Sequence, residues 1–166
     1  MLVSDNSRYD QYVKGNTSAL TSAEIEGMNI FMSKCNSCHT APLFTDENFH
    51  NNGIARFIDK GRNLVTLQDS DLYKFKTPTL RNIEKTMPYM HDGRFQTLEQ
   101  VIEHYNSGVK NHPNVSPFLK DANGNPQQLN LTEQQKAALV AFLRTLTDPN
   151  ILHNEKWSDP FINQHL

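Results

Sequence analysis

Three stretches of the chain carry apolar residues at the spacing of an amphipathic helix. Each opens with a threonine followed three residues later by Glu or Gln, at Thr21, Thr97 and Thr132, which is the pattern of a capping box. The three predicted helices with their apolar faces are 22–34 with Ile25, Met28, Phe31 and Met32, 98–107 with Leu98, Val101, Ile102 and Tyr105, and 133–147 with Leu139, Phe142, Leu143 and Leu146.

The segments between these helices are polar and irregular. Residues 1–20 are predicted to form an extended lead-in, residues 40–76 and 109–130 long loops, and residues 150–166 a peripheral tail. No alternating strand pattern and no internal repeat interrupts this arrangement. The chain is therefore predicted to be a single all-α domain over residues 1–166, with few helices joined by long loops. Loops of this length need a further group to fill the core.

The composition is that of an ordinary globular protein, with 166 residues of which 37% are apolar and 20% charged. A net charge of −2 provides no basic field, so neither nucleic acid nor an anionic membrane surface is expected as a partner. No apolar run approaches the roughly 18 residues that a membrane span requires. The first residues lack the basic and apolar regions of a signal peptide, so we expect a mature, trimmed or partial sequence.

The two cysteines stand three residues apart in a Cys-x-x-Cys-His motif at Cys35, Cys38 and His39. This spacing is that of c-type haem attachment. Thiols three apart at a helix end lie on one face and reach the two vinyl groups of one porphyrin, and His39 then presents its imidazole to the iron as the proximal ligand. The porphyrin also supplies the apolar plate that the polar loop 40–76 needs.

Two other readings of the cysteine pair stay open at this point. A redox-active dithiol of the thioredoxin kind requires a βαβ context, which the pattern does not contain. A zinc site requires two more ligands, and His50, His91 and His104 show no paired, finger-like spacing. A disulfide framework and an iron–sulfur cluster both need more cysteines than two. The motif therefore favours one covalent haem c.

Several other segments strongly resemble the bacterial di-haem cytochrome c peroxidases and their MauG-type relatives. The segments are Phe75-Lys76-Thr77-Pro78-Thr79-Leu80-Arg81-Asn82, Pro88-Tyr89-Met90-His91-Asp92-Gly93 and Thr97-Leu98-Glu99-Gln100-Val101-Ile102, with Ser7-Arg8-Tyr9-Asp10 and residues 131–148 at the two ends. The resemblance covers nearly the whole chain, and it is to the C-terminal one of the family's two haem domains. It implies a cytochrome c-like fold and a periplasmic location.

The resemblance also implies different roles for the two haem domains. In that family the C-terminal haem receives electrons and peroxide is reduced at the N-terminal haem, which has no counterpart in this sequence. The only tryptophan is Trp157, in the tail, so the family's inter-haem tryptophan is missing as well. We expect an electron-transfer domain that is not catalytic alone, with a second haem domain, of the same or another chain, and a small redox donor protein as partners.

Three residues compete for the second axial position on the iron, namely Met90, His104 and Tyr105. In the peroxidases that this sequence resembles, the distal ligand is a methionine fourteen residues after the histidine of the His-Asp-Gly turn. MauG-type proteins, which this sequence resembles more closely, have a tyrosine at that position. Counting fourteen residues from His91, as the resemblance directs, leads to Tyr105. The helical period agrees, because Tyr105 falls on the apolar face and His104 falls about 100° away. Tyr105 is the predicted distal ligand, Met90 is the fallback, and an ordinary core aromatic is the alternative role for Tyr105.

The resemblance assigns weaker roles to further residues. Thr86 and Pro88 match positions whose backbone carbonyls bind calcium between the two haem domains, so a calcium site is expected. Arg81 is a candidate partner for a haem propionate, with a solvated arginine as the alternative. His91 is either a residue near the haem or a hydrogen-bonded turn residue. The remaining histidines, read as surface residues, are His50, His112, His153 and His165.

The leading hypothesis is the electron-transfer half of a di-haem peroxidase or MauG-like oxidoreductase. A free-standing mono-haem electron carrier is the main alternative, and a haem sensor with an open sixth site is another.

Overall fold

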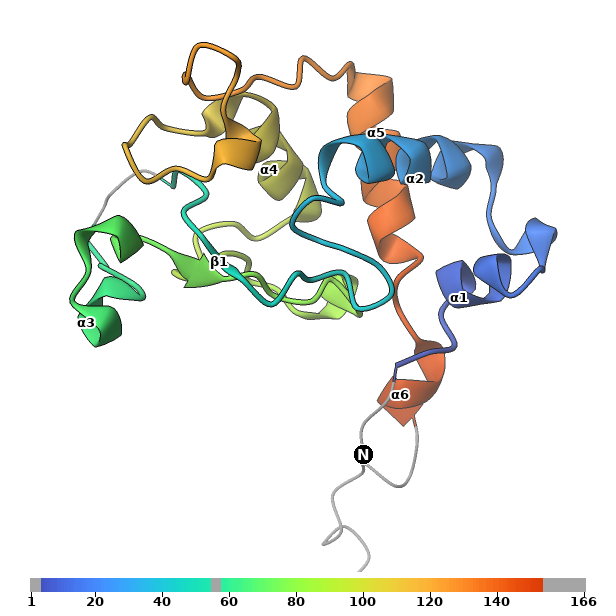
Figure 1. The fold of residues 1–166 in the computed structure, drawn as a ribbon. Helices are drawn as coiled ribbons and strands as arrows, with labels where there is room; N and C mark the ends of the chain where they lie inside the picture. The colour runs from blue at the N-terminus through green and yellow to red at the C-terminus, as the bar shows by residue number, and fades with distance from the viewer. Residues whose placement is uncertain (1–3, 55–57, 154–166) are drawn as a thin grey trace, which may run out of the picture.

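The computed structural model describes residues 4–54 and 58–153 of the chain. It is built mainly from helices joined by long irregular segments (Figure 1), which confirms the all-α prediction. The α-helices are α1 (Arg8–Val13), α2 (Ser22–Lys34), α3 (Asn63–Thr66), α4 (Leu98–Glu103), α5 (Glu133–Arg144) and α6 (Pro149–His153), and the two strands are β1 (Phe49–His50) and β2 (Phe75–Lys76).

The three capping boxes predicted from the sequence are all confirmed. Thr21, Thr97 and Thr132 each accept a hydrogen bond from the backbone N–H three residues later, and the Glu or Gln there accepts from the backbone N–H of the threonine. These reciprocal bonds satisfy donors that would otherwise be unpaired at a helix start. They fix where α2, α4 and α5 begin.

The extended lead-in predicted for residues 1–20 is wrong, because this segment contains α1 and a short 3₁₀ turn at Thr17–Ala19. Ser7 and Asp10 form a fourth capping box, with Ser7 N–H donating to Asp10 Oδ2 at 2.9 Å. The aspartate stands where the usual pattern has Glu or Gln, so the box gave no signal in the sequence.

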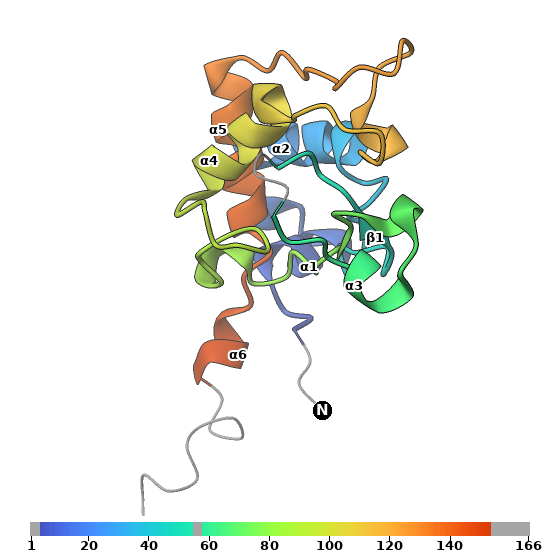
Figure 2. The same ribbon diagram turned by 90° about the vertical axis from the view of Figure 1, so that its left-hand side faces the viewer.

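Helices α2 and α5 cross closely and form the centre of the fold (Figures 1 and 2). Gly27 makes the crossing possible, since a Cβ atom built there would lie 2.0 Å from the carbonyl oxygen of Ala138. Four buried aromatic rings pack around this contact, with centroid distances such as 5.2 Å between Phe31 and Phe142. The rings belong to Tyr9, Phe31, Phe44 and Phe142.

The apolar face predicted for the last helix is confirmed, because its four residues are all buried, although α5 ends at Arg144 and Leu146 lies just beyond it. The face predicted for α2 is only partly correct. Phe31 is buried, but the next residue, Met32, is 37% exposed, because one step along a helix turns the side chain by about 100°.

The helix that begins at Thr97 changes its pitch before it ends. α4 stops at Glu103, and His104–Gly108 continue as a π-helical turn. His104 is buried although the helical period places it off the apolar face, and its ring Nε2 lies 2.9 Å from the backbone carbonyl oxygen of Asn52. Tyr105 is partly buried and packs against the core. The prediction that His104 lies off the buried face is therefore wrong.

The long segment 40–76 is mostly irregular, as predicted, but contains short regular pieces. β1 and β2 pair antiparallel, with Phe49 opposite Lys76 and His50 opposite Phe75, so the expectation of no strand is wrong. The hydroxyl of Thr45 donates to the carbonyl oxygen of Thr77 at 2.7 Å. The loop thus folds back on the segment that follows it and places residues 50–54 beside the core.

The first and last described segments are joined by one carboxylate. Asp148 Oδ2 accepts from the backbone N–H groups of Asp5 and Asn6 at 3.2 and 3.1 Å. The Asp148 N–H donates to Asn82 Oδ1 at 2.8 Å. Residues 149–153 form α6, so the first part of the predicted tail is helical, and the rest lies outside the described residues.

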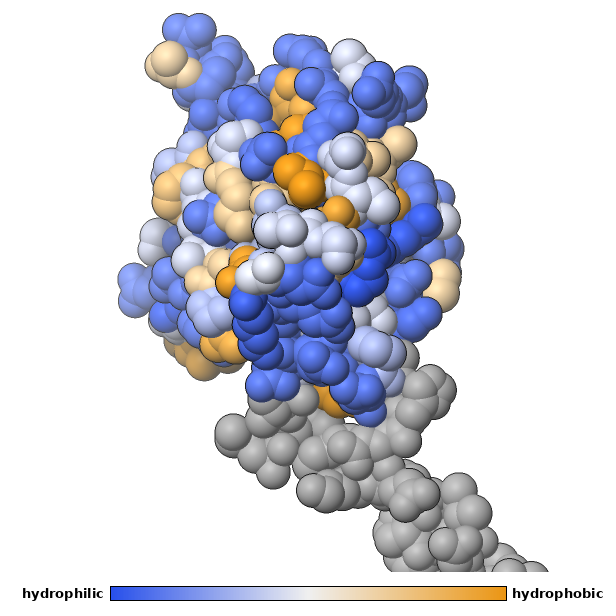
Figure 3. Space-filling model, turned by 90° about the vertical axis from the view of Figure 1, so that its right-hand side faces the viewer, coloured by the Kyte–Doolittle hydropathy of each residue, from blue (hydrophilic) through white to orange (hydrophobic). Residues whose placement is uncertain are grey.

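The outer face beside α1 and the start of α2 is largely hydrophilic in its lower half, and hydrophobic residues reach it in separate small groups (Figure 3). Within the described ranges, no helix combines the length and apolar character needed to cross a bilayer.

Candidate haem-attachment site

The Cys-x-x-Cys-His motif forms a tight turn at the end of α2. The backbone N–H of Cys35 donates to Phe31 O at 2.8 Å and closes the helix. The N–H groups of Cys38 and His39 then both donate to Cys35 O, at 3.2 and 3.0 Å. The two sulfurs are free of any disulfide. One hydrogen-bonded turn therefore carries both thiols and the imidazole, as the motif predicts.

Both thiols are poor candidates for redox chemistry. Burial, together with the neighbouring Cys38, raises the pKa of Cys35 to about 12. Burial and the carboxylate of Asp46 raise the pKa of Cys38 to about 11. Reactive dithiols have lowered rather than raised pKa values, because the thiolate is the nucleophile. The environment of the pair thus argues against a redox-active dithiol.

The imidazole of His39 is held in one orientation by the chain that follows it. Its Nδ1 lies 3.1 Å from the carbonyl oxygen of Phe44, which accepts only, so Nδ1 carries the proton. Burial lowers the pKa of His39 despite this bond, which favours the neutral ring. Nε2 then keeps its lone pair, as a metal ligand requires. Phe44 is itself fully buried among the core aromatic rings.

Two of the three residues that compete for the distal position meet at one side chain. Asn52 Nδ2 lies 3.4 Å from Met90 Sδ and 3.5 Å from the hydroxyl oxygen of Tyr105. Burial raises the pKa of the Tyr105 phenol, the bond from Asn52 opposes this, and the thiols of Cys35 and Cys38 raise it further. The influence of the two thiols means that the phenol lies near the attachment turn.

The third competitor, His104, already has a partner. Its Nε2 lies 2.9 Å from the backbone carbonyl oxygen of Asn52. A carbonyl only accepts, so Nε2 donates and is not available as a ligand in this arrangement. The structure thus brings Met90 and Tyr105 together and gives His104 a supporting role. The assignment of Tyr105 as the distal ligand stays a prediction.

The donor set and one orphaned atom fit a haem. Paired thiols, one imidazole with a free Nε2 and a phenol or thioether nearby are the groups that c-type haem uses. Asn51 is buried. Among the buried side-chain nitrogen and oxygen atoms in the described part of the chain, its Nδ2 is the one without a hydrogen-bond partner. Such a donor is costly unless it is paired, so it suits an acceptor on a bound group.

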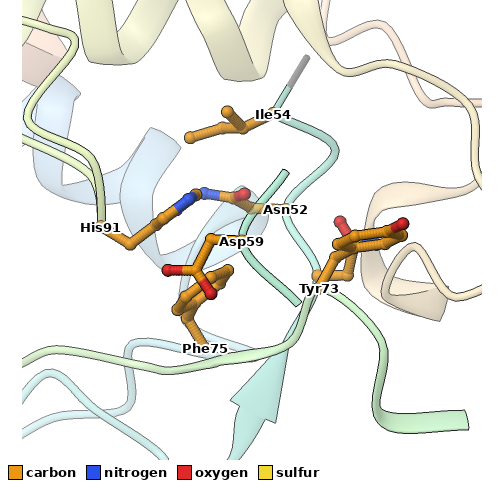
Figure 4. A pocket seen from close by; sticks show the side chains of 7 residues that line it. Asn52, Ile54, Asp59, Tyr73, Phe75 and His91 are labelled. Atoms are coloured by element: carbon orange, nitrogen blue, oxygen red, sulfur yellow. The ribbon is translucent and has the colours of Figure 1, made fainter. Parts of the chain in front are cut away.

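A small pocket adjoins these residues (Figure 4). Its lining includes Asn51 and Asn52, and also Phe75 and His91, whose rings stack with centroids 3.8 Å apart. Ile54, Asp59 and Tyr73 complete the lining. The pocket is therefore bounded by Asn52, which also contacts Met90 and Tyr105.

The candidate propionate partner, Arg81, is engaged within the protein. Its Nη1 and Nη2 donate to the two carboxylate oxygens of Asp10 at 2.8 and 2.9 Å, and its Nε donates to Pro42 O at 2.9 Å. These bonds use three of the five guanidinium N–H groups. The alternative of a solvated arginine does not fit, since the side chain is only 10% exposed. Propionate binding remains a prediction that has to use the other N–H groups.

Thr86 and Pro88, the expected calcium ligands, are both exposed, in the segment after the 3₁₀ turn Ile83–Lys85. Calcium binding at these two residues stays a prediction. His91 is exposed and stacks on Phe75, a contact that neither sequence reading proposed.

The reading of His50 as a plain surface residue is wrong. Its Nε2 lies 2.7 Å from Asp46 Oδ2 and its Nδ1 lies 3.1 Å from the hydroxyl oxygen of Ser116, which is buried. His112 is partly buried and packs edge-on to Tyr73. His165 and the side chain of His153 lie outside the described residues.

Sequence reasoning missed two groups of residues at this site. Asp46 and His50 gather beside Cys38, with potential ligand atoms within 4.8 Å of one another. A haem bonded through the Cys38 sulfur removes that thiolate, so this group does not compete with a haem in the finished protein. Asn52 was also missed, and the only local signal was its place in an Asn-Asn-Gly sequence.

Comparisons with known proteins identify the family of this chain. The profile of the cytochrome c family matches residues 24–147. Cytochrome-c peroxidase IdrP2 of Denitromonas iodatirespirans is 34% identical, over 88% of this chain and 45% of its own length. Methylamine utilization protein MauG of Methylorubrum extorquens is 35% identical, over 87% of this chain and 40% of its own length. This chain thus spans less than half the length of these relatives.

A solved structure gives the same answer for the fold. The crystal structure of a MauG-like protein associated with microbial copper homeostasis superposes with a TM-score of 0.80 at 33% identity. It covers 95% of this chain, and the match takes up 56% of that protein. The predicted cytochrome c-like fold is confirmed.

Proposed function

Because the chain belongs to the cytochrome c family and is related to the cytochrome c peroxidases and MauG proteins, we propose that it is an electron-transfer haem domain. It carries one haem c and exchanges electrons with a second, peroxide-reacting haem domain. The observation that carries this proposal is the single turn on which Cys35, Cys38 and His39 stand, with the bond from His39 Nδ1 to Phe44 O favouring the tautomer whose Nε2 is unprotonated.

Each residue of the site has a definite task in this proposal. The sulfurs of Cys35 and Cys38 form the thioether bonds, and His39 Nε2 is the proximal ligand. Tyr105 is the distal ligand, with Met90 as the second choice. The bound haem supplies a centre that gains and loses one electron. The protein holds the imidazole in one tautomer and keeps the thiol side of the turn partly buried.

The partners follow from the relationship with longer proteins. The relatives are more than twice as long as the part that matches, so a second haem domain, in the same polypeptide or another, is the proposed electron partner. A small redox protein is the proposed donor, and backbone carbonyls of Thr86 and Pro88 are the proposed calcium ligands towards the second domain. Thioether formation needs an exporting, haem-supplying compartment, so the proposed location is the periplasm.

Export of the chain into a bacterial periplasm together with a haem c maturation system tests the proposal. We expect a red protein whose haem stays attached in denaturing electrophoresis and whose pyridine haemochrome spectrum shows two thioether bonds and one haem per chain. The Cys35→Ser/Cys38→Ser double variant, exported in the same way, is the control and should lose the covalent haem. Colourless wild-type protein with two alkylatable thiols would refute the proposal.

A free-standing mono-haem carrier is the second candidate, since the Cys-x-x-Cys-His turn provides the one attachment site that such a carrier needs. Both candidates predict a haem, and they differ in their response to peroxide. The electron-transfer half of a peroxidase should accelerate peroxide reduction only when a second haem domain is added, whereas a carrier should cycle without turnover in both cases. Stopped-flow oxidation of the reduced domain by peroxide, with and without a purified peroxidatic domain, separates them.

A further inference from the structure

We propose that Asn52 is a positioning residue that selects Tyr105 over Met90 as the distal ligand of the haem iron. The inference rests on the proposed function, because it presupposes that a haem is bound at the Cys-x-x-Cys-His turn. It starts from the fact that a single amide nitrogen contacts both candidate ligand atoms. These contacts are 3.4 Å to Met90 Sδ and 3.5 Å to the Tyr105 oxygen.

An amide NH₂ group has two hydrogens and no lone pair to offer, so Asn52 Nδ2 acts on both neighbours as a donor. The two acceptors respond differently. A phenol oxygen that binds a metal carries negative charge, and hydrogen bonds to charged acceptors are stronger than those between neutral groups. A thioether sulfur is a weak acceptor with little charge, so the same donor gains little from it, whether or not the sulfur binds a metal through its second lone pair. Asn52 therefore stabilises the oxygen ligand more than the sulfur ligand.

The backbone around Asn52 is fixed from several sides. Its carbonyl oxygen accepts from His104 Nε2 at 2.9 Å, which ties it to the residue before Tyr105. On the other side, Gly53 N–H donates to Asn51 Oδ1 and Gly53 O accepts from the N–H of Lys110, both at 2.8 Å.

Gly53 adds a steric reason for this rigidity. It has a positive φ of +68°, and a Cβ atom built on it would lie 2.6 Å from Val109 Cγ1. The backbone of residues 51–53 therefore sits close against residues 109–110 and has little freedom to carry the Asn52 amide away from its two partners. An amide held in this way is oriented before a ligand binds, so it loses little entropy when it acts.

The two ligands have opposite electronic consequences, which makes the choice measurable. Methionine ligation raises the reduction potential of a c-type haem. A hard oxygen donor stabilises ferric iron and lowers the potential. Asn52 thus lowers the reduction potential of the haem indirectly, by favouring Tyr105 as the ligand.

Substitution of Asn52 in the haem-loaded domain tests the inference. Asn52→Leu removes the donor, and Asn52→Asp keeps the size but is acceptor-only when ionised. For both variants we expect the ferric protein to gain the methionine-to-iron charge-transfer band in its visible spectrum, with a change in its EPR g values and a higher reduction potential. One charge-assisted hydrogen bond corresponds to about a tenfold change in the ratio of Met90-bound to Tyr105-bound iron.

The double variant Asn52→Leu/Met90→Leu is the matched control, and it should lose the charge-transfer band again. Circular dichroism and the haem content of each variant show that the fold and the attachment are intact. Two outcomes overturn the inference: single variants with unchanged spectra and potential, or a wild-type protein that already shows the methionine band. Failure of the proposed function is a separate result, since it appears as missing covalent haem in the wild-type protein.

Discussion

Arg81 and Asp10 form a bidentate ion pair between α1 and the loop that precedes the 3₁₀ turn at Ile83–Lys85. Arg81 Nη1 and Nη2 lie 2.8 and 2.9 Å from the two carboxylate oxygens, across a sequence separation of 71 residues. The side chains are only 10% and 8% exposed, and Ser7 donates to the same carboxylate. The pair therefore links the N-terminal helix to the segment that leads to the predicted distal ligands.

Substitution of Arg81 by Met should destabilise the domain strongly, because it leaves the carboxylate of Asp10 largely buried without its cation. Removal of one partner of a buried pair typically costs about 3 kcal/mol or more. Urea unfolding of the haem-loaded domain measures this loss. Arg94→Met is the matched control, since the Arg94–Asp92 pair is more exposed, at 25% and 34%, and is expected to contribute about 1 kcal/mol at most. Equal losses for the two variants would contradict the assigned role.

The same pair makes stability depend on pH in the acid range. Burial raises the pKa of Asp10, but hydrogen bonds from Arg81 and Ser7 outweigh burial and hold the pKa below its ordinary value of 3.8. A lowered folded-state pKa adds stability above the unfolded-state pKa of about 3.9, and this stability is lost as the pH falls through the folded-state pKa. The difference in unfolding free energy between the wild type and Asp10→Asn should be larger at pH 6 than near pH 3. Parallel stability curves for the two proteins would refute this linkage.

Gly27→Ala should destabilise the crossing of α2 and α5, although alanine favours helices over glycine. The added methyl group would lie 2.0 Å from Ala138 O and 2.9 Å from Phe142 Cβ, so the helices have to separate. Overpacking of this kind costs about 3 kcal/mol, which thermal unfolding can resolve. Asn29→Ala, on the exposed side of the same helix, is the control and should change stability by about 0.5 kcal/mol or less. A Gly27→Ala protein as stable as the control would show that the crossing tolerates a side chain.

Tyr105→Phe and Met90→Leu should have different effects on the haem-loaded domain. The first removes the predicted distal oxygen ligand, so we expect changed ferric EPR and visible spectra and a higher reduction potential. The second should leave these spectra like those of the wild type, because Met90 is the unselected neighbour. If Met90→Leu alone alters the axial-ligand spectrum, the fallback ligand is the real one.

The parts of this molecule that were predictable from its sequence are those specified by neighbouring residues. The capping boxes at Thr21, Thr97 and Thr132 act over three residues, and the apolar face of α5 repeats within one helix. The attachment turn is equally local, since its hydrogen bonds join residues 31–39. Each of these features can be predicted from neighbouring residues, without information on contacts with the rest of the chain.

The parts that were not predictable depend on contacts between distant segments. Asn52 meets Tyr105 at a separation of 53 residues, and nothing around Asn52 in the sequence marks it as a ligand neighbour. The π turn at His104–Gly108 also left no trace in the apolar pattern, and the burial of His104 accompanies a bond to Asn52 O, 52 residues away, which the helical period could not predict. Tertiary packing overrode the local period at this point.

The hydrogen bonds that Asp148 accepts from the N-terminal segment should form late in folding. These bonds to the backbone of Asp5 and Asn6 span separations of 143 and 142 residues, and contacts of such separation are expensive in chain entropy until the rest of the fold has assembled. They should therefore be absent from the rate-limiting folding barrier. Asp148→Ala is then expected to accelerate unfolding while the refolding rate stays nearly unchanged, so the lifetime of the folded domain depends on a carboxylate outside the Cys-x-x-Cys-His turn.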